Sequence, residues 1–350
     1  MKALLLTANA TLEHVDRREP PAPESGWVTV RVAHAGVCGS DIPRGFESGA
    51  YHYPLVMGHE FSATVEKTAA GSSYAPGERV AVFPLIPNPA EEINQIGEFA
   101  VGRSYDYFGS RRDGAFQELL NVPEFNLLRI PDDFSLEAAS LVEPCAVAYH
   151  AAARPQISAG QTALVIGGGP IGNMVAQWLR LRGCTPIIVS EPDEKKRRLA
   201  AEMGFTAIDP AVDDPVEYSD SLSAGGADIV VEACGLPLTF RQAVSAAGLF
   251  GQVVFLGNIH GELRLDEKLV SSILRRELTI YGTWNSRFVP KGTGEWKKVI
   301  DAMHRGDIEV APLVSHRVSL DRAAETLTAM RNKAMWFNKV IITPGAGPTD

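Results

Sequence analysis

Four side chains of the kinds that bind zinc lie in the first half of the chain. They are Cys38 in a Cys-Gly-Ser-Asp run, His59 and Glu60 in a Gly-His-Glu run, and Glu143 in a Leu-Val-Glu-Pro run. Zinc accepts thiolate, imidazole and carboxylate ligands in a tetrahedral site, and a catalytic zinc keeps one position open. We therefore predict that Cys38, His59 and Glu143 bind one zinc ion. Glu60 either binds the same ion or contacts one of its ligands.

Each of these residues also has an ordinary structural explanation. A lone cysteine is usually a small buried hydrophobe, a lone histidine is usually just hydrogen-bonded, and Glu143 could cap a helix ahead of Pro144. Cys145 could also compete as a ligand. The metal prediction therefore depends on the combination of these residues and on a second motif further along the chain.

A glycine-rich segment after an apolar stretch is typical of a dinucleotide site. The residues that we predict to contact the cofactor there are Gly167, Gly169, Pro170, Ile171 and Gly172. The glycines fit G-x-G-x-x-G, which permits a tight turn, close approach of pyrophosphate and close helix packing. An apolar strand, residues 162–166, precedes the turn, and an amphipathic helix comes after it, so the helix N-terminus would hold the phosphates.

An acidic residue indicates which nicotinamide cofactor binds. Glu191 ends the next predicted strand, 19 positions after Gly172. A carboxylate there can accept both ribose hydroxyls of NAD and would repel the 2′-phosphate of NADP. The basic run at 195–198 could instead hold NADP, with Lys196 the best placed to touch the ribose. We predict NAD.

The elements expected around these motifs change along the chain. Up to residue 131 prolines and glycines are frequent. The alternating valines of residues 28–32 predict a half-buried strand, and residues 80–83, which follow a turn, predict another strand. Small residues from 138 to 153 predict a helix. The remaining predictions are apolar strands at 162–166, 186–189, 227–231 and 252–256, helices at 194–203, 296–303 and 320–330, and strands at 314–318 and 339–342. Apolar strands alternating with helices predict an α/β fold with a doubly wound parallel sheet.

The composition limits the class of protein. The chain has 350 residues, 45% of them hydrophobic and 21% charged, which suits two soluble domains. A formal net charge of -9 argues against nucleic acid as a partner. We find no apolar run long enough for a membrane and no signal peptide. The 4 cysteines show no disulfide-like clustering, so we expect thiols in the cytoplasm.

Together these motifs resemble those of the zinc-containing medium-chain dehydrogenases, and within them the polyol branch of sorbitol and galactitol-1-phosphate 5-dehydrogenases. The resemblance covers nearly the whole chain and includes Gly-Ser-Arg-Arg-Asp-Gly at 109–114 and Leu-Arg-Arg-Glu-Leu-Thr at 274–279. It implies a discontinuous GroES-like catalytic domain, residues 1–146 and 286–350, and an inserted Rossmann NAD-binding domain, residues 147–285. The alcohol dehydrogenases of this superfamily use a second cysteine where the polyol enzymes use glutamate, so Glu143 points to the polyol branch.

One lobe departs from the family pattern. The family often holds a structural zinc with the spacing C-x2-C-x2-C-x7-C, and the corresponding positions here are Asn88, Glu91, Asn94 and Gly102. None of them is a thiolate. We predict that the structural zinc is absent and that packing holds this lobe. The residues expected to pack are Ile86, Ile93, Ile96 and Phe99.

The resemblance implies oxidation of a secondary hydroxyl of a sugar alcohol to a ketose, with hydride transfer to NAD. Zinc would act as a Lewis acid on the hydroxyl. Ser40 would relay its proton, with His52 or His34 as extensions, and Cys38, His59 and Glu60 complete the catalytic set. The substrate implied by the resemblance is a polyol or a polyol phosphate such as a hexitol of the galactitol 1-phosphate kind. The candidate cations for a phosphate are Arg111, Arg112, Arg287 and Lys291.

Other functions remain open at this point. The same mechanism could act on a free hexitol such as altritol or sorbitol, on threonine or on butanediol. A zinc-free quinone or enone reductase of the same fold, or a non-catalytic nucleotide-binding protein, would not need the metal ligands.

Residues 277–284 are predicted to form a strand at the edge of a sheet, and an exposed edge strand needs to be covered by another part of the protein or by a partner. Subunits pair there in this family, so we expect a homodimer or homotetramer.

Overall fold

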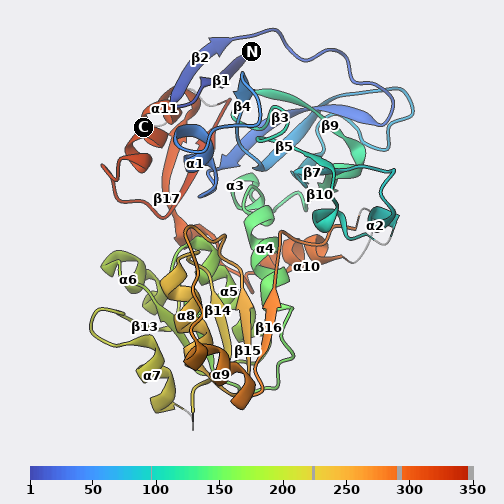
Figure 1. Cartoon of the computed structure of the whole chain (residues 1–350). Coiled ribbons are helices and arrows are strands. Elements are labelled where there is room, and N and C mark those ends of the chain that lie inside the picture. Colours follow the sequence, from blue (N-terminus) through green and yellow to red (C-terminus); the bar gives the residue numbers. More distant parts are fainter. Residues whose placement is uncertain (96, 223–224, 290–293, 346–350) are drawn as a thin grey trace. The chain divides into compact units, whose positions relative to one another are not determined.

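The computed structural model describes residues 1–95, 97–222, 225–289 and 294–345 (Figure 1). Its internal contacts divide the chain into two compact units. Unit 1 comprises Met1–Pro144, Arg287–Gly306 and Val310–Asp350, and unit 2 comprises Cys145–Ser286 and Asp307–Glu309. The candidate zinc ligands therefore lie in unit 1, and the glycine-rich turn lies in unit 2.

The main sheet of unit 1 joins strands from both ends of the chain. Among the described residues its strand order is β10 (Leu127–Arg129), β6 (Arg79–Val82), β5 (Glu60–Thr68), β3 (Trp27–Gly36), β18 (Lys339–Thr343) and β17 (Val314–Ser319), and β9 (Leu119–Pro123) also pairs with β3. In the central strand β3 the three alternating valines are buried, as predicted. β3 pairs antiparallel with β5 on one side and with β18 on the other.

Smaller sheets and helices complete unit 1. One sheet contains β2 (Thr11–Asp16), β1 (Lys2–Ala8) and β4 (Leu55–Val56), and another contains β7 (Leu85–Pro87) and β8 (Tyr105–Tyr107). The helices are α1 (Asp41–Phe46), α2 (Glu92–Gln95), α3 (Leu136–Ala139), α10 (Glu295–His304) and α11 (Leu320–Arg331), with 3-10 turns at Phe99–Val101, Glu124–Asn126 and Ala311–Leu313. The helices α10 and α11 confirm the predictions made for those segments.

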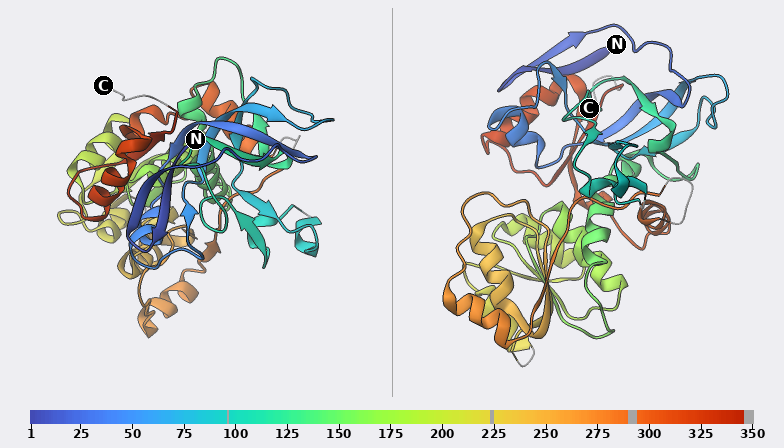
Figure 2. Two further views of the ribbon diagram at one scale, coloured as in Figure 1. Left: turned by 90° about the horizontal axis from the view of Figure 1, so that it is seen from above. Right: turned by 45° about the vertical axis from the view of Figure 1, so that its right-hand side comes forward.

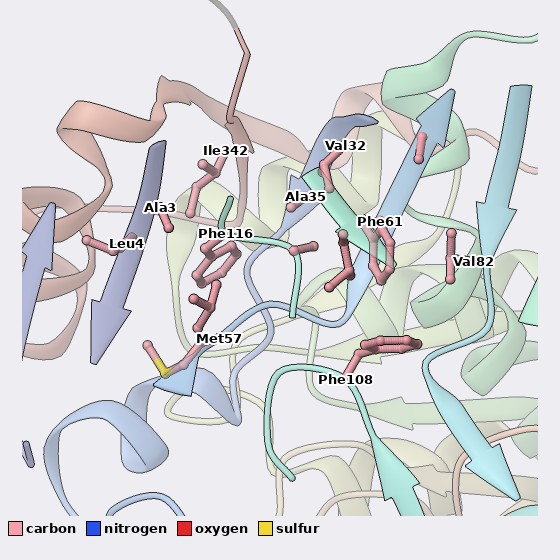
Figure 3. Packing of buried hydrophobic residues seen from close by; sticks show 14 of the residues in the cluster. Ala3, Leu4, Val32, Ala35, Met57, Phe61, Val82, Phe108, Phe116 and Ile342 are labelled. Atoms are coloured by element: carbon pink, nitrogen blue, oxygen red, sulfur yellow. The ribbon is translucent and has the colours of Figure 1, made fainter. Parts of the chain in front are cut away.

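A single apolar cluster fixes the strands that carry the site (Figure 3). Ala35 of β3, Phe61 of β5 and Ile342 of β18 all belong to it, and each is at most 1% exposed. The ring of Phe61 also meets that of Phe108 edge to face, with centroids 6.1 Å apart. Burying one such large side chain stabilises a fold by about 1.5–3 kcal/mol. The three strand ends next to these residues are therefore held in place.

Unit 2 is the predicted doubly wound sheet. Its strands lie in the order β13 (Thr206–Ile208), β12 (Ile187–Ser190), β11 (Ala163–Ile166), β14 (Ala227–Glu232), β15 (Ala247–Phe255) and β16 (Thr279–Gly282), and all are parallel. Its helices are α5 (Pro170–Leu181), α6 (Glu194–Glu202), α7 (Pro215–Leu222), α8 (Pro237–Ala246) and α9 (Glu267–Arg275). Figure 2 shows helices on both faces of this sheet. The strand order reverses between β11 and β14, and such a reversal marks the usual ligand site in these sheets.

The helix predicted from 138 to 153 is interrupted. α3 ends at Ala139, and α4 (Val142–Ala152) begins after a break. Pro144 stands in the first turn of α4, and in a continuous helix its ring would clash with the carbonyl four residues earlier. The break places Glu143 in the first turn of a helix. None of the helices in the described part of the chain combines the length and apolar character that a membrane crossing requires.

Candidate active site

Three of the predicted ligands lie close together. The Sγ of Cys38, a ring nitrogen of His59 and a carboxylate oxygen of Glu60 all lie within 4.8 Å of one another. Across the described ranges of the chain, no other His, Cys, Asp or Glu side chains form such a group of three or more. Thiolate, imidazole and carboxylate are the donors that zinc takes. The donor set therefore fits the predicted ion.

Neighbouring strands bring these donors together. Cys38 stands two residues after the end of β3, and Glu60 begins β5. The two strands pair so that Gly36 lies opposite Glu60. Side chains that are 22 positions apart in the sequence thus start from adjacent points of one sheet.

The motif at residues 109–114 supports the loop that carries His59. The N–H of Gly114 donates to the Val56 carbonyl at 2.7 Å, and the N–H of Ala115 donates to the Gly58 carbonyl at 2.9 Å. These backbone hydrogen bonds fix the segment that leads into His59 and Glu60. The motif therefore has a structural role next to the site.

A buried carboxylate, Asp41, contacts two of the ligands. Its Oδ2 accepts the N–H of Cys38 at 3.0 Å, and its Oδ1 lies 3.6 Å from Nδ1 of His59. Arg44 donates to the same Oδ1 at 3.0 Å. Nδ1 of His59 is buried and has no hydrogen-bond partner among the described residues. Asp41 can thus orient the ring so that its other nitrogen faces a metal. We did not assign this role from the sequence, although Asp41 stands in the Cys-Gly-Ser-Asp motif.

Glu143 lies near these donors but outside the group of three. It is buried, and the Tyr107 hydroxyl donates to its Oε1 at 3.4 Å. The Tyr107 ring also lies 5.6 Å from the ring of His59, centroid to centroid. Burial raises the pKa of Glu143 to about 8, His59 opposes this, and Glu60 and Cys38 raise the pKa further. Glu143 is therefore close enough for these residues to alter its charge, and its role as a ligand stays a prediction.

A buried cation, Lys339, was not identified from the sequence. It begins β18, and its Nζ forms an ion pair with Oε2 of Glu60 and donates to the Val37 carbonyl at 2.9 Å. Burial lowers the pKa of this ammonium, but Glu60 and Cys38 outweigh the burial and raise the pKa above its usual value. In the sequence Lys339 is simply a lysine ahead of an apolar strand, and this pattern is just as common for a lysine at the protein surface.

The charges of these groups favour a bound cation. Burial, then Glu60 and Asp41, raise the pKa of the Cys38 thiol to about 11, while Lys339 and Ser40 oppose this rise. A divalent ion favours the thiolate and carboxylate forms of nearby side chains. A metal ion would therefore stabilise the thiolate of Cys38, whose thiol does not easily ionise alone.

Ser40 is the predicted proton relay. It is exposed beside Cys38, and its N–H contacts the Sγ of Cys38 at 3.5 Å. The two histidines considered as extensions have other contacts. Nε2 of His52 lies 3.1 Å from the Arg111 carbonyl oxygen, and Nδ1 of His34 lies 3.1 Å from Oγ1 of Thr343. Each contact occupies one ring nitrogen only, so a relay through either ring stays a prediction, whereas the exposed hydroxyl of Ser40 can pass a proton directly to water.

The glycine-rich turn in unit 2 has the geometry of its motif. Gly167 has a φ of +110°, and a Cβ at Gly172 would lie 1.8 Å from the Gly167 carbonyl oxygen. Gly169 caps α5, and Pro170 occupies its first turn, where a missing N–H costs nothing. A Cβ atom placed on Gly169 would have no other atom within 4 Å, so the space beside this residue is open. The open helix N-terminus can therefore accept a pyrophosphate.

Glu191 is held beside this turn. It is 8% exposed, its Oε2 accepts the N–H of Gly168 at 2.8 Å, and its Oε1 accepts the N–H of Asp193 at 2.9 Å. Burial raises the pKa of the nearby Cys234 thiol to about 12, with Glu232 and Glu191 adding to the rise and Lys196 opposing it. Glu191 and Lys196 thus both lie within electrostatic reach of Cys234, whose Sγ donates to the carbonyl that precedes Gly167.

The lobe without cysteines is held by hydrogen bonds as well as by packing. The Glu91 carboxylate accepts the N–H groups of Arg103, at 2.8 Å, and of Ser104, and also the Ser104 hydroxyl at 2.5 Å. The Phe99 ring packs 5.4 Å from that of Phe125. Ile96 lies outside the described residues. The prediction of packing omitted these hydrogen bonds, because the partners of Glu91 could not be recognised in the sequence. The absence of a structural zinc stays a prediction.

Two family models match separate parts of the chain. A zinc-binding dehydrogenase model matches residues 170–305, and an alcohol dehydrogenase GroES-like domain model matches residues 24–132. Galactitol 1-phosphate 5-dehydrogenase of Escherichia coli strain K12 is 29% identical and aligns with 98% of this chain and 100% of its own. (R,R)-butanediol dehydrogenase of Bacillus subtilis strain 168 is also 29% identical, over 95% of this chain and 96% of its own.

Solved structures agree with these matches. The crystal structure of Escherichia coli galactitol-1-phosphate dehydrogenase has a TM-score of 0.91 at 28% identity and covers 98% of this chain and 100% of its own. A protein of Sinorhizobium meliloti 1021, solved with NADP as a candidate zinc-binding dehydrogenase, has a TM-score of 0.88 at 30% identity, over 98% of this chain and 99% of its own. The α/β fold with GroES-like and Rossmann-like parts is thereby confirmed. The chain belongs to the zinc-type medium-chain dehydrogenase/reductase superfamily, and it is an oxidoreductase of the alcohol and polyol dehydrogenase kind.

Proposed function

We propose that this protein oxidises a secondary hydroxyl of a sugar alcohol, free or phosphorylated, to a ketone, with NAD as the hydride acceptor. The observation that supports this most is the group formed by Cys38, His59 and Glu60, with the Glu143 carboxylate beside it. Glutamate in place of a second cysteine is the pattern of the polyol enzymes that this chain resembles.

Zinc bound by Cys38, His59 and Glu143 would supply Lewis acidity at the alcohol oxygen, and NAD would accept the hydride. The chain's own residues have separate tasks. Asp41 orients the His59 ring, and the exposed Ser40 takes the hydroxyl proton toward water. Glu191 already accepts one hydrogen bond on each carboxylate oxygen. Each oxygen retains a lone pair that can accept a ribose hydroxyl of NAD.

A panel assay with purified protein tests this proposal. The panel contains hexitols, their 1-phosphates, butanediol and threonine with NAD or NADP, and quinones or enones with the reduced cofactors. We expect metal-dependent NADH formation with a hexitol or its phosphate. Turnover of quinones alone without metal would favour the reductase, and cofactor binding without any turnover would favour a non-catalytic protein.

Arg111 is the cation that we infer for a substrate phosphate. Arg112 pairs with Asp106 at 2.6 Å, Arg287 forms an ion pair with Glu98, and Lys291 lies outside the described residues. Arg111 has no carboxylate partner in the described parts of the chain. It donates to the Tyr105 carbonyl at 2.5 Å, and its guanidinium lies 4.4 Å from the Tyr105 ring centroid and 5.3 Å from that of Tyr51.

Two tyrosines of one strand connect Arg111 with the surroundings of the metal ligands. Tyr105 shares the short strand β8 with Tyr107, which contacts Glu143, and the two tyrosine rings lie 6.3 Å apart. A guanidinium held by aromatic rings and free of carboxylates is suited to a phosphate.

Arg111→Met is therefore expected to lower kcat/KM for a hexitol 1-phosphate by about 10- to 100-fold, since a hydrogen bond to a charged group contributes about 1.5–3 kcal/mol. The value for the free hexitol should change by about twofold or less. Arg322→Met, an exposed arginine of α11 paired with Glu325, is the matched control. Equal losses on both substrates, or equal wild-type rates, would rule out a dedicated phosphate contact.

We also infer that the protein self-associates through the edge strand β16. Apolar side chains are exposed on and around this edge, including Phe250 at 70%, Leu274 at 72% and Trp284 at 54%. An uncovered sheet edge with adjacent apolar surface is a pairing site.

Leu274→Asp should shift the protein from a dimer or tetramer toward a monomer of 37.7 kDa at micromolar concentration, as measured by analytical ultracentrifugation. Val212→Asp, at a position of unit 2 that is 79% exposed, should leave the assembly intact. A monomeric wild-type protein would contradict the inference.

A further inference from the structure

The ion pair between Lys339 and Glu60 joins two strands across a third. β5 and β18 lie on opposite sides of β3, and the pair passes over the end of β3 at Gly36. Lys339 is 4% exposed and Glu60 is 2% exposed. A Cβ at Gly36 would lie 2.3 Å from Oε2 of Glu60 and 3.1 Å from Cε of Lys339. The pair therefore exists because residue 36 has no side chain.

The ammonium of Lys339 also lies between the two segments that carry metal ligands. It contacts the carbonyl of Val37, the residue before Cys38, and the carboxylate of Glu60, the residue after His59. No other lysine or arginine in the described ranges forms an ion pair with Glu60. One buried side chain thus restrains both segments.

Glu60 has two competing partners in this arrangement. One of its carboxylate oxygens lies within 4.8 Å of the donor atoms of Cys38 and His59, so it is close enough to join them as a ligand. Its Oε2 is held by Lys339. A catalytic zinc needs a position that protein side chains leave open for the substrate. A fourth protein ligand would close that position.

We propose that Lys339 is a positioning residue that holds Glu60 away from the metal and thereby keeps one coordination position open for the substrate. This inference rests on the proposed zinc site. Without the ammonium, a buried carboxylate beside a divalent ion has no better partner than the ion. Glu60 would then be expected to join the ligands, so that the metal would stay bound but its open position would be lost.

The test uses Co²⁺ in place of zinc, because the visible absorption of cobalt reports its coordination, and imidazole as a probe of the open position. The wild-type protein is expected to bind one Co²⁺ and to change its spectrum when imidazole is added. Lys339→Met should keep its Co²⁺ but bind imidazole at least tenfold more weakly. Lys339→Arg, which retains the charge, should stay closer to the wild-type protein.

A double variant separates this role from a structural one. Lys339→Met combined with Glu60→Gln should recover imidazole binding, because an amide does not replace the carboxylate as a ligand. If Lys339 were only structural, the double variant would bind imidazole no better than Lys339→Met, and both would lose metal.

Gly36→Ala provides a second route if Lys339→Met does not fold. Its methyl group meets the far end of a flexible side chain, so we expect the fold to persist while Glu60 is displaced from Lys339. Imidazole binding should weaken as in Lys339→Met. Wild-type imidazole affinity in Lys339→Met or Gly36→Ala would overturn the proposal. A wild-type protein that binds no Co²⁺ would instead overturn the zinc site on which it rests.

Discussion

Cys38→Ser is expected to contain no zinc and to lose at least about a thousandfold in kcat/KM, which corresponds to roughly 4 kcal/mol at 1.36 kcal/mol per tenfold. The thiol is the one sulfur donor in the group with His59 and Glu60. A serine hydroxyl fits the same space, but it does not ionise to a comparable ligand. Metal content and turnover should therefore fall together while the fold is kept, as judged by circular dichroism.

Cys145→Ser is the matched control for this experiment. Burial raises the pKa of the Cys145 thiol to about 12, and its side chain contacts Trp178. We expect this variant to retain its zinc. A Cys38→Ser protein with full zinc content and a normal rate would contradict the proposed ligand set, and loss of zinc in Cys145→Ser alone would move the site to that cysteine.

Glu191→Gln is expected to lower kcat/KM for NAD by about 10- to 100-fold and to improve the use of NADP. The carboxylate is held in place by the N–H groups of Gly168 and Asp193. A hydrogen bond between the ionised acid and a ribose hydroxyl contributes about 1.5–3 kcal/mol, most of which the amide loses. The amide also removes the negative charge that repels a 2′-phosphate.

Steady-state kinetics with both cofactors measure this change. Glu194→Gln, an exposed acid paired with Arg198 in helix α6, should leave the preference unchanged. A wild-type protein that prefers NADP would contradict the role given to Glu191. Such a result would assign the ribose end of the cofactor to Lys196 instead.

Elements of the fold could be predicted from the sequence where a single requirement, such as burial or a special backbone conformation, determines the residue type. The central strands of unit 2 are buried on both faces, so they appear as continuous apolar runs such as residues 163–166. The glycines at 167 and 172 are required by a positive φ and by close packing, and both could be predicted from the motif. The break before Glu143 was missed although Pro144 signals it, because the small residues around it favour a continuous helix.

The residues that surround the metal ligands were harder to predict. Asp41 stands inside the Cys-Gly-Ser-Asp motif, but its contact with His59 depends on how α1 follows β3. Lys339 lies 279 positions after Glu60, and only the pairing of β18 with β3 brings the two together. Tyr107 reaches Glu143 from a short strand that no periodic pattern indicates. These contacts depend on tertiary pairing, which a local pattern does not contain.

We propose that one metal ion, held by unit 1, is required for turnover. The most direct measurement removes metal from the purified protein with a chelator and returns zinc in known amounts while the rate is followed. We predict that the rate falls with the metal and recovers in proportion to added zinc, reaching its maximum at one ion per chain. A sample without metal that turns over its alcohol at the full rate would contradict this account.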